Sequence, residues 1–386
     1  MAAAASREQA IRTNRRLHVL HVSGPTMGGV ATVAESYVRD QVERGWTVTV
    51  ACPSHGDLGY AAREAGATVR WWRAEQQDST RPGAVARLNR IVRDTRPDVV
   101  HLHGGKAGLA GRLVVRNRVP TVYQPHAWPF LARRGGAAQG ASVRWERFAA
   151  RWATEVVCVS ATERQLGESL GLHAATTVIP NGIDLTGYRP AGAGDRVHAR
   201  KLLGLEDVPT VVCVGALTVQ KGQQDLLADW PEVRVRVPDA QLVLVGQGPD
   251  RAALERIAGE LDGVRFAGGR TDIPLWLAAA DVVVVPSRWE GMALVPLEAM
   301  ASARSVVATD VNGIVDSVPE GAGAIVPLND GEALVDALVE RLTDEELAEA
   351  EGWLGRAHVE THHDVTTSTR ELARVYLRLV GARRSR

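Results

Sequence analysis

Two glutamates with seven residues between them, Glu290 and Glu298, stand where a helix is predicted to begin. The apolar run 282–285 predicts a buried strand, the loop after it carries Glu290, and the following helix carries Glu298. Backbone N–H groups at a helix start suit a phosphate, whereas ionised carboxylates accept hydrogen bonds and therefore suit vicinal hydroxyls. A loop carboxylate and a surface glutamate are the plainer alternative, but Glu298 lies among apolar residues, where a carboxylate needs donors. The segment predicts a site for a sugar nucleotide.

Two other segments could bind an anion. Lys221 follows a buried strand and precedes a helix that starts near Gly222. We expect it to point towards the Glu290 loop and to neutralise a diphosphate as a point charge, with a solvated surface lysine as the alternative. The glycine loop 24–29 is not a GxGxxG fingerprint, so it could hold an anion or simply form a tight turn.

Histidines follow or occupy two predicted strands of the first half. His126 comes just after the run 121–124, where it could donate to a sugar hydroxyl or serve as a structural hydrogen-bonder. His101 and His103 alternate with Leu102, and we expect them to face opposite sides of their strand, which disfavours a shared metal ion. The sequence has no Asp-X-Asp pair, CxxC, HExxH or Walker lysine. No metal site is predicted.

Apolar runs alternate with amphipathic segments along the chain, which predicts an α/β fold with two doubly wound, Rossmann-like parallel sheets. The two domains are expected to face a deep cleft, because carboxyl-end loops of such sheets carry the ligand. The boundaries follow from where the pattern breaks and restarts. We expect a disordered tail at 1–16, a first domain at 17–183, a linker at 184–207, a second domain at 208–364, and a final helix at 365–386 that can pack back on the first domain.

The composition limits the class of protein. Lys+Arg and Asp+Glu both number 45 among 386 residues, so no net field favours nucleic acid. Cys52, Cys158 and Cys213 lie in or beside apolar runs, which predicts buried thiols in a reducing cytosol. No run approaches the ~18 apolar residues of a membrane span, and the first apolar run is too short for a signal peptide. We expect a cytoplasmic protein with no transmembrane segment; peripheral membrane contact and the oligomeric state stay open.

Five motifs occur in the order found in glycosyltransferase family 4, whose retaining GT-B members the chain resembles over nearly its whole length. They are Gly28-Gly29, Ile179-Pro-Asn-Gly-Ile-Asp184, a Gly-X-Leu-X-X-X-Lys-Gly run ending at Gly222, Gly246-Gln-Gly-Pro249, and Glu290-X7-Glu298. The resemblance implies a GT-B fold, with an acceptor-side first domain and a nucleotide-sugar-binding second domain. It also implies retention of configuration, no metal-dependent step, and a UDP- or GDP-sugar as co-substrate without a further cofactor.

The resemblance also implies roles for single residues. Glu290 would bind the donor sugar's hydroxyls, Glu298 the ribose and Lys221 the diphosphate. His126 would contact the transferred sugar, which makes His126, Glu290 and Lys221 the catalytic candidates. The glycine loop would reach the diphosphate from the first domain, and the amides after Glu290 would face sugar and phosphates. The remaining donor-binding candidates are Gly28, Gly29, Gly246, Arg270, Gly291, Met292, Ala293 and Leu294.

The chain departs from the family pattern in three places. Ala216 stands where the family usually has an arginine, and losing such a charge-assisted contact costs ~1.5–3 kcal/mol. Either the activity is weakened, or another cation substitutes, for which Arg270 and Arg288 are the candidates. Ala303-Arg-Ser305 replaces a turn with small residues and proline, and Asn312-Gly313 replaces a Gly-Gly pair. These two changes bear on sugar selectivity more than on the fold.

The predicted function is transfer of a hexose, with retention, from a nucleotide-diphosphate sugar to a hydroxyl of a saccharide, glycolipid or natural product. A GT-B epimerase or phosphorylase is one alternative, and a degenerate nucleotide-sugar-binding protein is another. The small-molecule or glycan acceptor is not identified by the sequence, because acceptor loops vary freely on such a fold. A basic loop at 128–140, with Arg133 and Arg134, could meet an anionic acceptor or a membrane surface, or be solvated.

Overall fold

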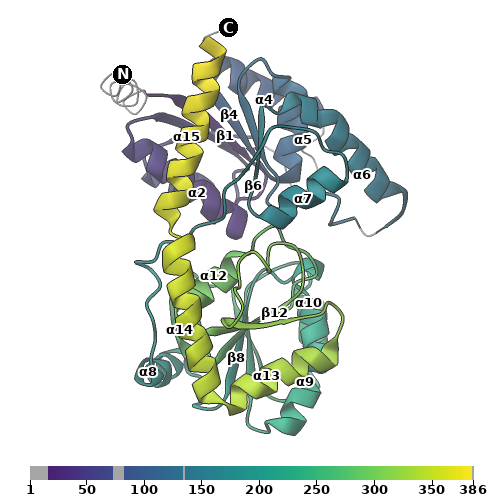
Figure 1. Ribbon diagram of the computed structural model, residues 1–386, viewed down its shortest axis with the longest axis vertical. Coiled ribbons are helices and arrows are strands. Elements are labelled where there is room, and N and C mark those ends of the chain that lie inside the picture. Colours follow the sequence, from purple (N-terminus) through teal and green to yellow (C-terminus); the bar gives the residue numbers. More distant parts are fainter. Residues whose placement is uncertain (1–15, 73–81, 134, 385–386) are drawn as a thin grey trace. The chain divides into compact units, whose positions relative to one another are not determined.

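The computed structural model describes residues 16–72, 82–133 and 135–384 (Figure 1). Most of the predicted tail at 1–16 and Arg134 of the predicted basic loop lie outside the described residues. The chain divides into two compact units. Unit 1 comprises Met1–Pro180 together with Thr366–Arg386, and unit 2 comprises Asn181–Val365. Each unit has its own parallel sheet and its own hydrophobic core.

Unit 1 is built on a parallel sheet with the strand order β3-β2-β1-β4-β5-β6-β7. The strands are β1 (His18–Ser23), β2 (Thr47–Cys52), β3 (Thr68–Trp71), β4 (Val99–His103), β5 (Thr121–Gln124), β6 (Glu155–Cys158) and β7 (Thr176–Val178). The helices are α2 (Gly29–Glu43), α3 (Leu58–Glu64), α4 (Pro82–Thr95), α5 (Gly104–Val115), α6 (Gly136–Ala149), α7 (Ala161–Ser169) and α15 (Val365–Arg384).

Helices cover both faces of this sheet, which explains why its central strands β1 and β4 are buried along almost their whole length. Helices α2 and α15 lie over one face (Figure 1), where Tyr376 of α15 bonds to His101 of β4. Helix α5 packs on the other face, where its Gly111 sits against Leu102. Helix α15 therefore completes the cover of a sheet formed by residues far from it in sequence.

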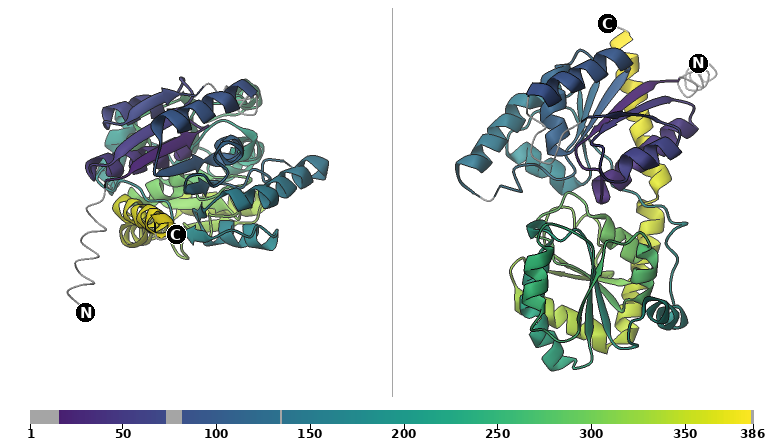
Figure 2. Two further views of the ribbon diagram at one scale, coloured as in Figure 1. Left: turned by 90° about the horizontal axis from the view of Figure 1, so that it is seen from above. Right: turned by 180° about the vertical axis from the view of Figure 1, so that it is seen from behind.

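Unit 2 repeats the architecture with the strand order β10-β9-β8-β11-β12-β13. Figure 2 shows helices on both faces of this sheet. The strands are β8 (Thr210–Val214), β9 (Gln241–Val245), β10 (Val264–Gly268), β11 (Val282–Val285), β12 (Ser305–Thr309) and β13 (Gly323–Val326). The helices are α8 (Ala193–Leu203), α9 (Gln223–Arg236), α10 (Arg251–Ala258), α11 (Ile273–Ala279), α12 (Leu294–Ala301), α13 (Gly331–Thr343) and α14 (Glu345–His362).

The predicted α/β class with two doubly wound parallel sheets is confirmed. Residues 184–207, for which the sequence suggested a linker, lie within unit 2 and contain helix α8. Arg200 of α8 forms an ion pair with Asp281 at 2.6 Å, so this segment is held to the sheet. The final helix, expected at 365–386, belongs to unit 1 from Thr366 onward.

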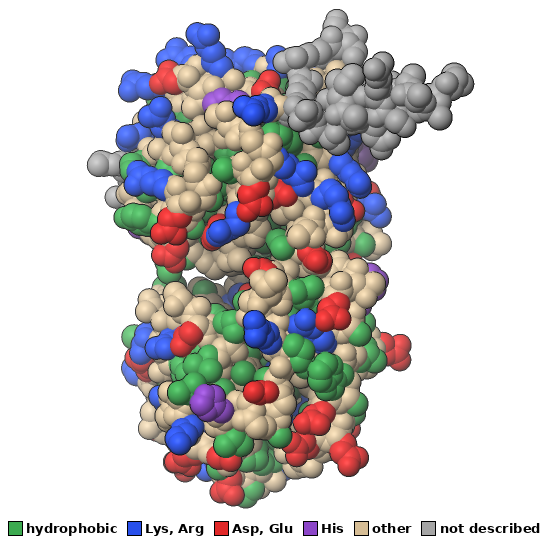
Figure 3. All heavy atoms as spheres, turned by 90° about the vertical axis from the view of Figure 1, so that its left-hand side faces the viewer, with side chains coloured by type: hydrophobic (Ala, Val, Ile, Leu, Met, Phe, Trp, Pro, Cys, Tyr) green, Lys and Arg blue, Asp and Glu red, His purple; other side chains and the backbone are tan. Residues whose placement is uncertain are grey.

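The three cysteines are buried and unpaired, as predicted. Within the described ranges, no helix is both long enough and apolar enough to cross a bilayer. Basic, acidic and hydrophobic side chains all occur on the face drawn in Figure 3.

Candidate functional site

The carboxyl ends of β8 and β11 bring Lys221 and Glu290 together in unit 2. Nζ of Lys221 lies 2.5 Å from Oε1 of Glu290. Lys221 ends a short 3-10 turn, and Gly222 follows with a φ of +68°. A Cβ on Gly222 would lie 1.9 Å from the carbonyl oxygen of Pro286, just after β11. Glycine is therefore required for the two loops to approach so closely.

Glu290 is 6% exposed, so its carboxylate needs donors from the protein. The hydroxyl of Ser287 donates to Oε1 at 2.7 Å, and Nε2 of Gln220 lies 3.4 Å from Oε2. Gln220 also donates to the carbonyl of Trp289 at 3.0 Å. The loop that carries the glutamate is thus tied to the loop that carries the lysine.

Glu298 lies in the second turn of α12 and is paired with Tyr188. The tyrosine hydroxyl donates to the carboxylate. Burial raises the pKa of Glu298, and this outweighs the Tyr188 hydrogen bond and the positive charge of Lys221, which both lower it. Burial likewise raises the pKa of Tyr188 well above its ordinary value. Lys221 is therefore electrostatically coupled to both glutamates of the pair.

The loop between the two glutamates is packed from behind. Gly291, Met292, Ala293 and Leu294 are all buried. Gly313, at a φ of +81°, approaches so closely that a Cβ on it would lie 1.9 Å from the carbonyl oxygen of Gly291. Within the Asn312-Gly313 pair, Gly313 therefore determines the shape of this loop, because there is no room for a side chain at that position.

The cations expected to replace the arginine missing at position 216 have other partners. Ala216 is exposed after β8, and its carbonyl accepts from Gln223 at 3.0 Å. Arg270 is paired with Asp272 and lies over Trp276. Arg288 holds both carboxylate oxygens of Asp225 at 2.7 and 2.5 Å. Each arginine is held by an acidic partner away from Glu290, whereas the ion pair of Lys221 is with Glu290 itself. Gly246 follows β9, with a half-buried backbone.

In unit 1, the glycine loop and His126 lie in separate places along the sheet. Gly28 precedes α2 with a φ of +71° that favours glycine, and Gly28 and Gly29 are exposed. His126 follows β5 with a φ of +59°, a backbone conformation that residues other than glycine rarely adopt. Nε2 of His126 lies 3.1 Å from Nδ1 of His103, so the ring of His126 is hydrogen-bonded to a buried histidine of β4.

The prediction that His101 and His103 face opposite sides of their strand is wrong. Their ring centroids are 4.0 Å apart. Residues two apart on a strand point to the same face, because side chains alternate with a period of two. The intervening residue, Leu102, packs on the opposite face instead.

This placement raises the question of a metal ion after all. Nitrogens of His21, His101 and His103 lie within 4.8 Å of one another. However, Nδ1 of His21 is 2.9 Å from Nε2 of His103, a hydrogen-bond distance between one donor and one acceptor. Two nitrogens bound to one Zn²⁺ at ~2.0–2.1 Å in a tetrahedral site stand farther apart than this. The three rings fit a hydrogen-bonded cluster better than a metal site.

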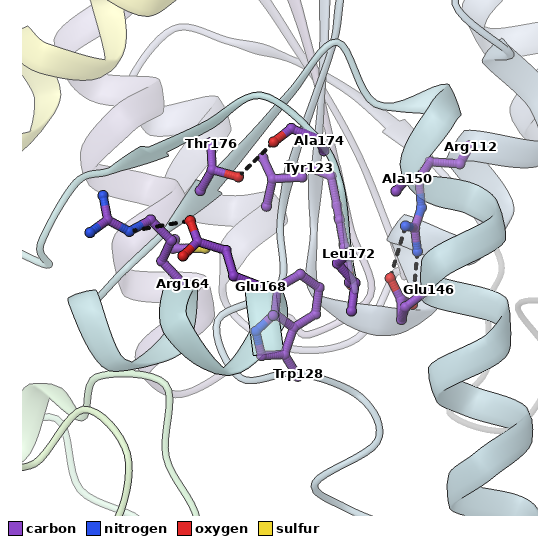
Figure 4. Close-up of a pocket in the computed structure, with 13 residues that line it drawn as sticks. Arg112, Tyr123, Trp128, Glu146, Ala150, Arg164, Glu168, Leu172, Ala174 and Thr176 are labelled. Atoms are coloured by element: carbon purple, nitrogen blue, oxygen red, sulfur yellow. Dashed lines mark hydrogen bonds and ion pairs between the residues drawn. The ribbon is translucent and has the colours of Figure 1, made fainter. Parts of the chain in front are cut away.

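A small cavity in unit 1 lies between α5, α6 and α7 (Figure 4). Its volume of about 10 Å³ leaves room for about one water molecule. The buried pair of Arg112 and Glu146 borders it, with nitrogen and oxygen 2.8 Å apart, and the guanidinium of Arg112 lies over the ring of Tyr123. This hollow is too small for a sugar and belongs to the packing of the unit.

The sequence did not single out Ser287, Gln220 or Tyr188, although all three bond to the predicted glutamates or their loop. Ser287 stands two residues after the buried strand β11 and three residues before Glu290, which was a usable signal. Tyr188 is 110 residues before Glu298 in the chain and could be found only from the fold.

Two family descriptions match the chain. Residues 27–186 match the family described as Glycosyltransferase Family 4, and residues 208–344 match the one described as Glycosyl transferases group 1. The first match covers most of unit 1 and ends just inside unit 2, and the second lies within unit 2. They include Gly28, His126, Lys221, Glu290 and Glu298.

Similar proteins and structures agree with these matches. A GDP-mannose-dependent alpha-(1-6)-phosphatidylinositol monomannoside mannosyltransferase of Mycobacterium tuberculosis is 30% identical over 381 residues, covering 90% of this chain and 94% of the relative. A GDP-mannose-dependent monoacylated alpha-(1-6)-phosphatidylinositol monomannoside mannosyltransferase of Corynebacterium glutamicum is 35% identical over 210 residues, covering 52% of this chain and 55% of the relative. The crystal structure of Anabaena Alr3699/HepE with UDP and glucose has a TM-score of 0.81 at 21% identity, over 93% of this chain and 99% of that chain.

Proposed function

The chain belongs to glycosyltransferase family 4, and we propose that it transfers a hexose from a nucleoside-diphosphate sugar to an acceptor hydroxyl. The observation that carries this proposal is the cluster of Lys221, Glu290 and Glu298 at the carboxyl ends of β8 and β11. The cluster offers one cation for a diphosphate and two carboxylates for hydroxyl groups. A nucleoside-diphosphate sugar has these groups in one molecule.

Each of the three residues takes one part of the donor in this proposal. Glu290 accepts from hydroxyls of the hexose, Glu298 accepts from the two ribose hydroxyls, and Lys221 neutralises the diphosphate. The Tyr188 hydroxyl gives Glu298 a donor before the ribose arrives. Binding the ribose would then add donors to a buried carboxylate that already has one, which favours its charged form.

The reaction that fits this arrangement proceeds with retention and without a metal ion. The acceptor oxygen forms its bond to C1 on the face from which the diphosphate leaves, and the acceptor proton passes to the departing diphosphate. The negative charge that develops on that leaving group is met by Lys221 and by backbone N–H groups. The lack of an Asp-X-Asp pair supports the metal-free part of the proposal, since a diphosphate-bound divalent ion prefers such oxygen ligands.

GDP-mannose is the donor to test first, with UDP-sugars second. The Mycobacterium tuberculosis relative, which this chain covers almost throughout, is named for GDP-mannose. A relative from Escherichia coli, 31% identical over 274 residues, is named for UDP-galactose and a diphosphoundecaprenol acceptor. These names also support a saccharide or a glycolipid as the acceptor.

Release of nucleoside diphosphate tests the proposal. The purified chain would be incubated with GDP-mannose, UDP-glucose and UDP-galactose, each with saccharide and glycolipid acceptors, with and without EDTA. We expect release with one donor, unchanged by EDTA, and an α-linked product. A product formed without any acceptor would favour an epimerase. Tight donor binding without turnover would favour a binding protein, for which Ala216 in place of the usual arginine is the supporting feature.

A further inference from the structure

A row of polar side chains is buried in unit 1 between the sheet and helices α2 and α15. None of its members is more than 2% exposed, and none carries a carboxylate, a guanidinium or an ammonium group. Buried polar groups are costly unless they are hydrogen-bonded to one another. The row consists of His21, Tyr37, Gln41, His101, His103, Gln124 and Tyr376.

At one end of the row, His103 contacts His126, the partly exposed histidine after β5, which is not itself a member of the row. Nε2 of His126 lies 3.1 Å from Nδ1 of His103, and Nε2 of His103 lies 2.9 Å from Nδ1 of His21. Nε2 of His21 lies 2.9 Å from Oε1 of Gln41. An amide oxygen accepts only, so His21 must donate from Nε2 and accept at Nδ1.

The proton position on each further histidine of the row follows in the same way, because a neutral imidazole has one donor and one acceptor nitrogen. Burial keeps these rings neutral: it lowers the pKa of His21 to about 4, and that of His103 well below its ordinary value. His103 then donates from Nε2 to His21 and accepts at Nδ1. The donor that Nδ1 of His103 requires is Nε2–H of His126.

The other end of the row agrees with this direction. Gln41 also bonds to Tyr376, whose hydroxyl lies 2.5 Å from Nδ1 of His101. With the Gln41 oxygen facing His21, its amide nitrogen donates to Tyr376, and Tyr376 donates to His101. His101 then carries its proton on Nε2, and neither this nitrogen nor Oε1 of Gln124 has a hydrogen-bond partner in the part of the chain that the structure describes. The links from His126 to His101 therefore run in one direction.

We propose that Gln41, acting through His21 and His103, fixes His126 as the Nε2–H tautomer, so that Nδ1 of His126 is left as a hydrogen-bond acceptor. His126 would then accept from a hydroxyl of the transferred sugar, where the sequence suggested that it donates. This last step rests on the proposed function, but the tautomer does not. Gln41 is a positioning residue in this scheme, since it has no contact with His126 itself.

Long-range ¹H–¹⁵N spectra of the ¹⁵N-histidine-labelled protein, without any donor, test the tautomer. We expect His126, identified by its loss in His126→Gln, to show a protonated Nε2 and a bare Nδ1 that do not change between pH 8 and about 5. The exposed His173 is the internal control, and its signals should be the same in the wild type and in His126→Gln. A protonated Nδ1 on His126, or one equivalent of bound metal with loss of the His21 N–H, would overturn the proposal.

Two substitutions at Gln41 test whether this residue sets the tautomer of His126 and thereby affects catalysis. Gln41→Met keeps the shape but removes the acceptor, so we expect both tautomers of His126 and a fall in kcat that exceeds any change in donor KM. Gln41→Glu keeps an acceptor oxygen and should retain the Nε2–H tautomer. Equal spectra for the wild type and Gln41→Met would overturn the role of Gln41. If Gln41→Met does not fold, the wild-type spectrum still decides the tautomer, and the proposed transfer can fail without affecting it.

Discussion

Nζ of Lys221 lies 2.5 Å from Oε1 of Glu290, and the same ammonium group lowers the pKa of Glu298. One cation therefore serves two carboxylates, both of which are largely shielded from water. Among the described residues, the arginines that were candidates for a second cation are held by Asp225 and Asp272. In the proposed function, the charge of the diphosphate is therefore met chiefly by Lys221.

Lys221→Met should therefore weaken donor binding strongly. Charge-assisted hydrogen bonds contribute ~1.5–3 kcal/mol, so donor KM should rise roughly 10- to 150-fold, with a further loss in kcat as charge develops on the leaving group. Lys221→Arg should recover part of the loss. The control is Lys201→Met, on the exposed face of α8. Steady-state kinetics check the prediction, and an unchanged donor KM in Lys221→Met would show that the diphosphate binds elsewhere.

The order of strands and helices could be predicted because each parallel strand is an apolar run between amphipathic segments. The pairing of Lys221 with Glu290 could also be predicted, since both follow strands whose carboxyl ends meet at one edge of a sheet. The partner of Glu298 could not, because the bond to Tyr188 depends on how residues 181–190 fold back on α12. The buried row around His101 was missed for a different reason, an error about which strand residues share a face.

Tyr188→Phe should move the pH dependence of donor use. Glu298 must be ionised to accept from two ribose hydroxyls, and the Tyr188 hydrogen bond lowers its pKa against the effect of burial. Without that bond the pKa rises further, so the acidic limb of the kcat/KM profile should shift to higher pH. Tyr60→Phe, at an exposed position in unit 1, is the control. A shift to lower pH, or none, would exclude Glu298 as the group that limits donor binding.

Gly313→Ala should impair the donor loop specifically. A Cβ at this position would lie 1.9 Å from the carbonyl oxygen of Gly291, so the loop after Glu290 must move. Gly321→Ala is a matched control: its φ of +83° is similar, but the nearest atom, Cδ1 of Leu354, lies 3.2 Å away on a flexible side chain. Both variants should lose ~1–2 kcal/mol of stability from the positive φ. Only Gly313→Ala should raise donor KM, as measured beside thermal unfolding; equal kinetics for the two would remove Gly313 from the site.

Acid should destabilise unit 1 through its buried histidines. An unfolded histidine takes up a proton near pH 6.5, whereas burial lowers the pKa of folded His21 to about 4. Between these values the unfolded chain binds more protons than the folded chain, so the free energy of unfolding falls as pH falls.

For His21 alone, the slope of the unfolding free energy against pH reaches ~1.4 kcal/mol per pH unit. His21→Gln should reduce the slope by that amount, whatever it does to stability at pH 7, and His173→Gln, at an exposed position, is the control for a histidine substitution. Hydrogen exchange of the β1 and β4 amides between pH 7 and 5, corrected for intrinsic rates, measures this directly. Identical slopes in the wild type and His21→Gln would mean that His21 is already charged in the folded protein, which the direction of the hydrogen-bonded row does not allow.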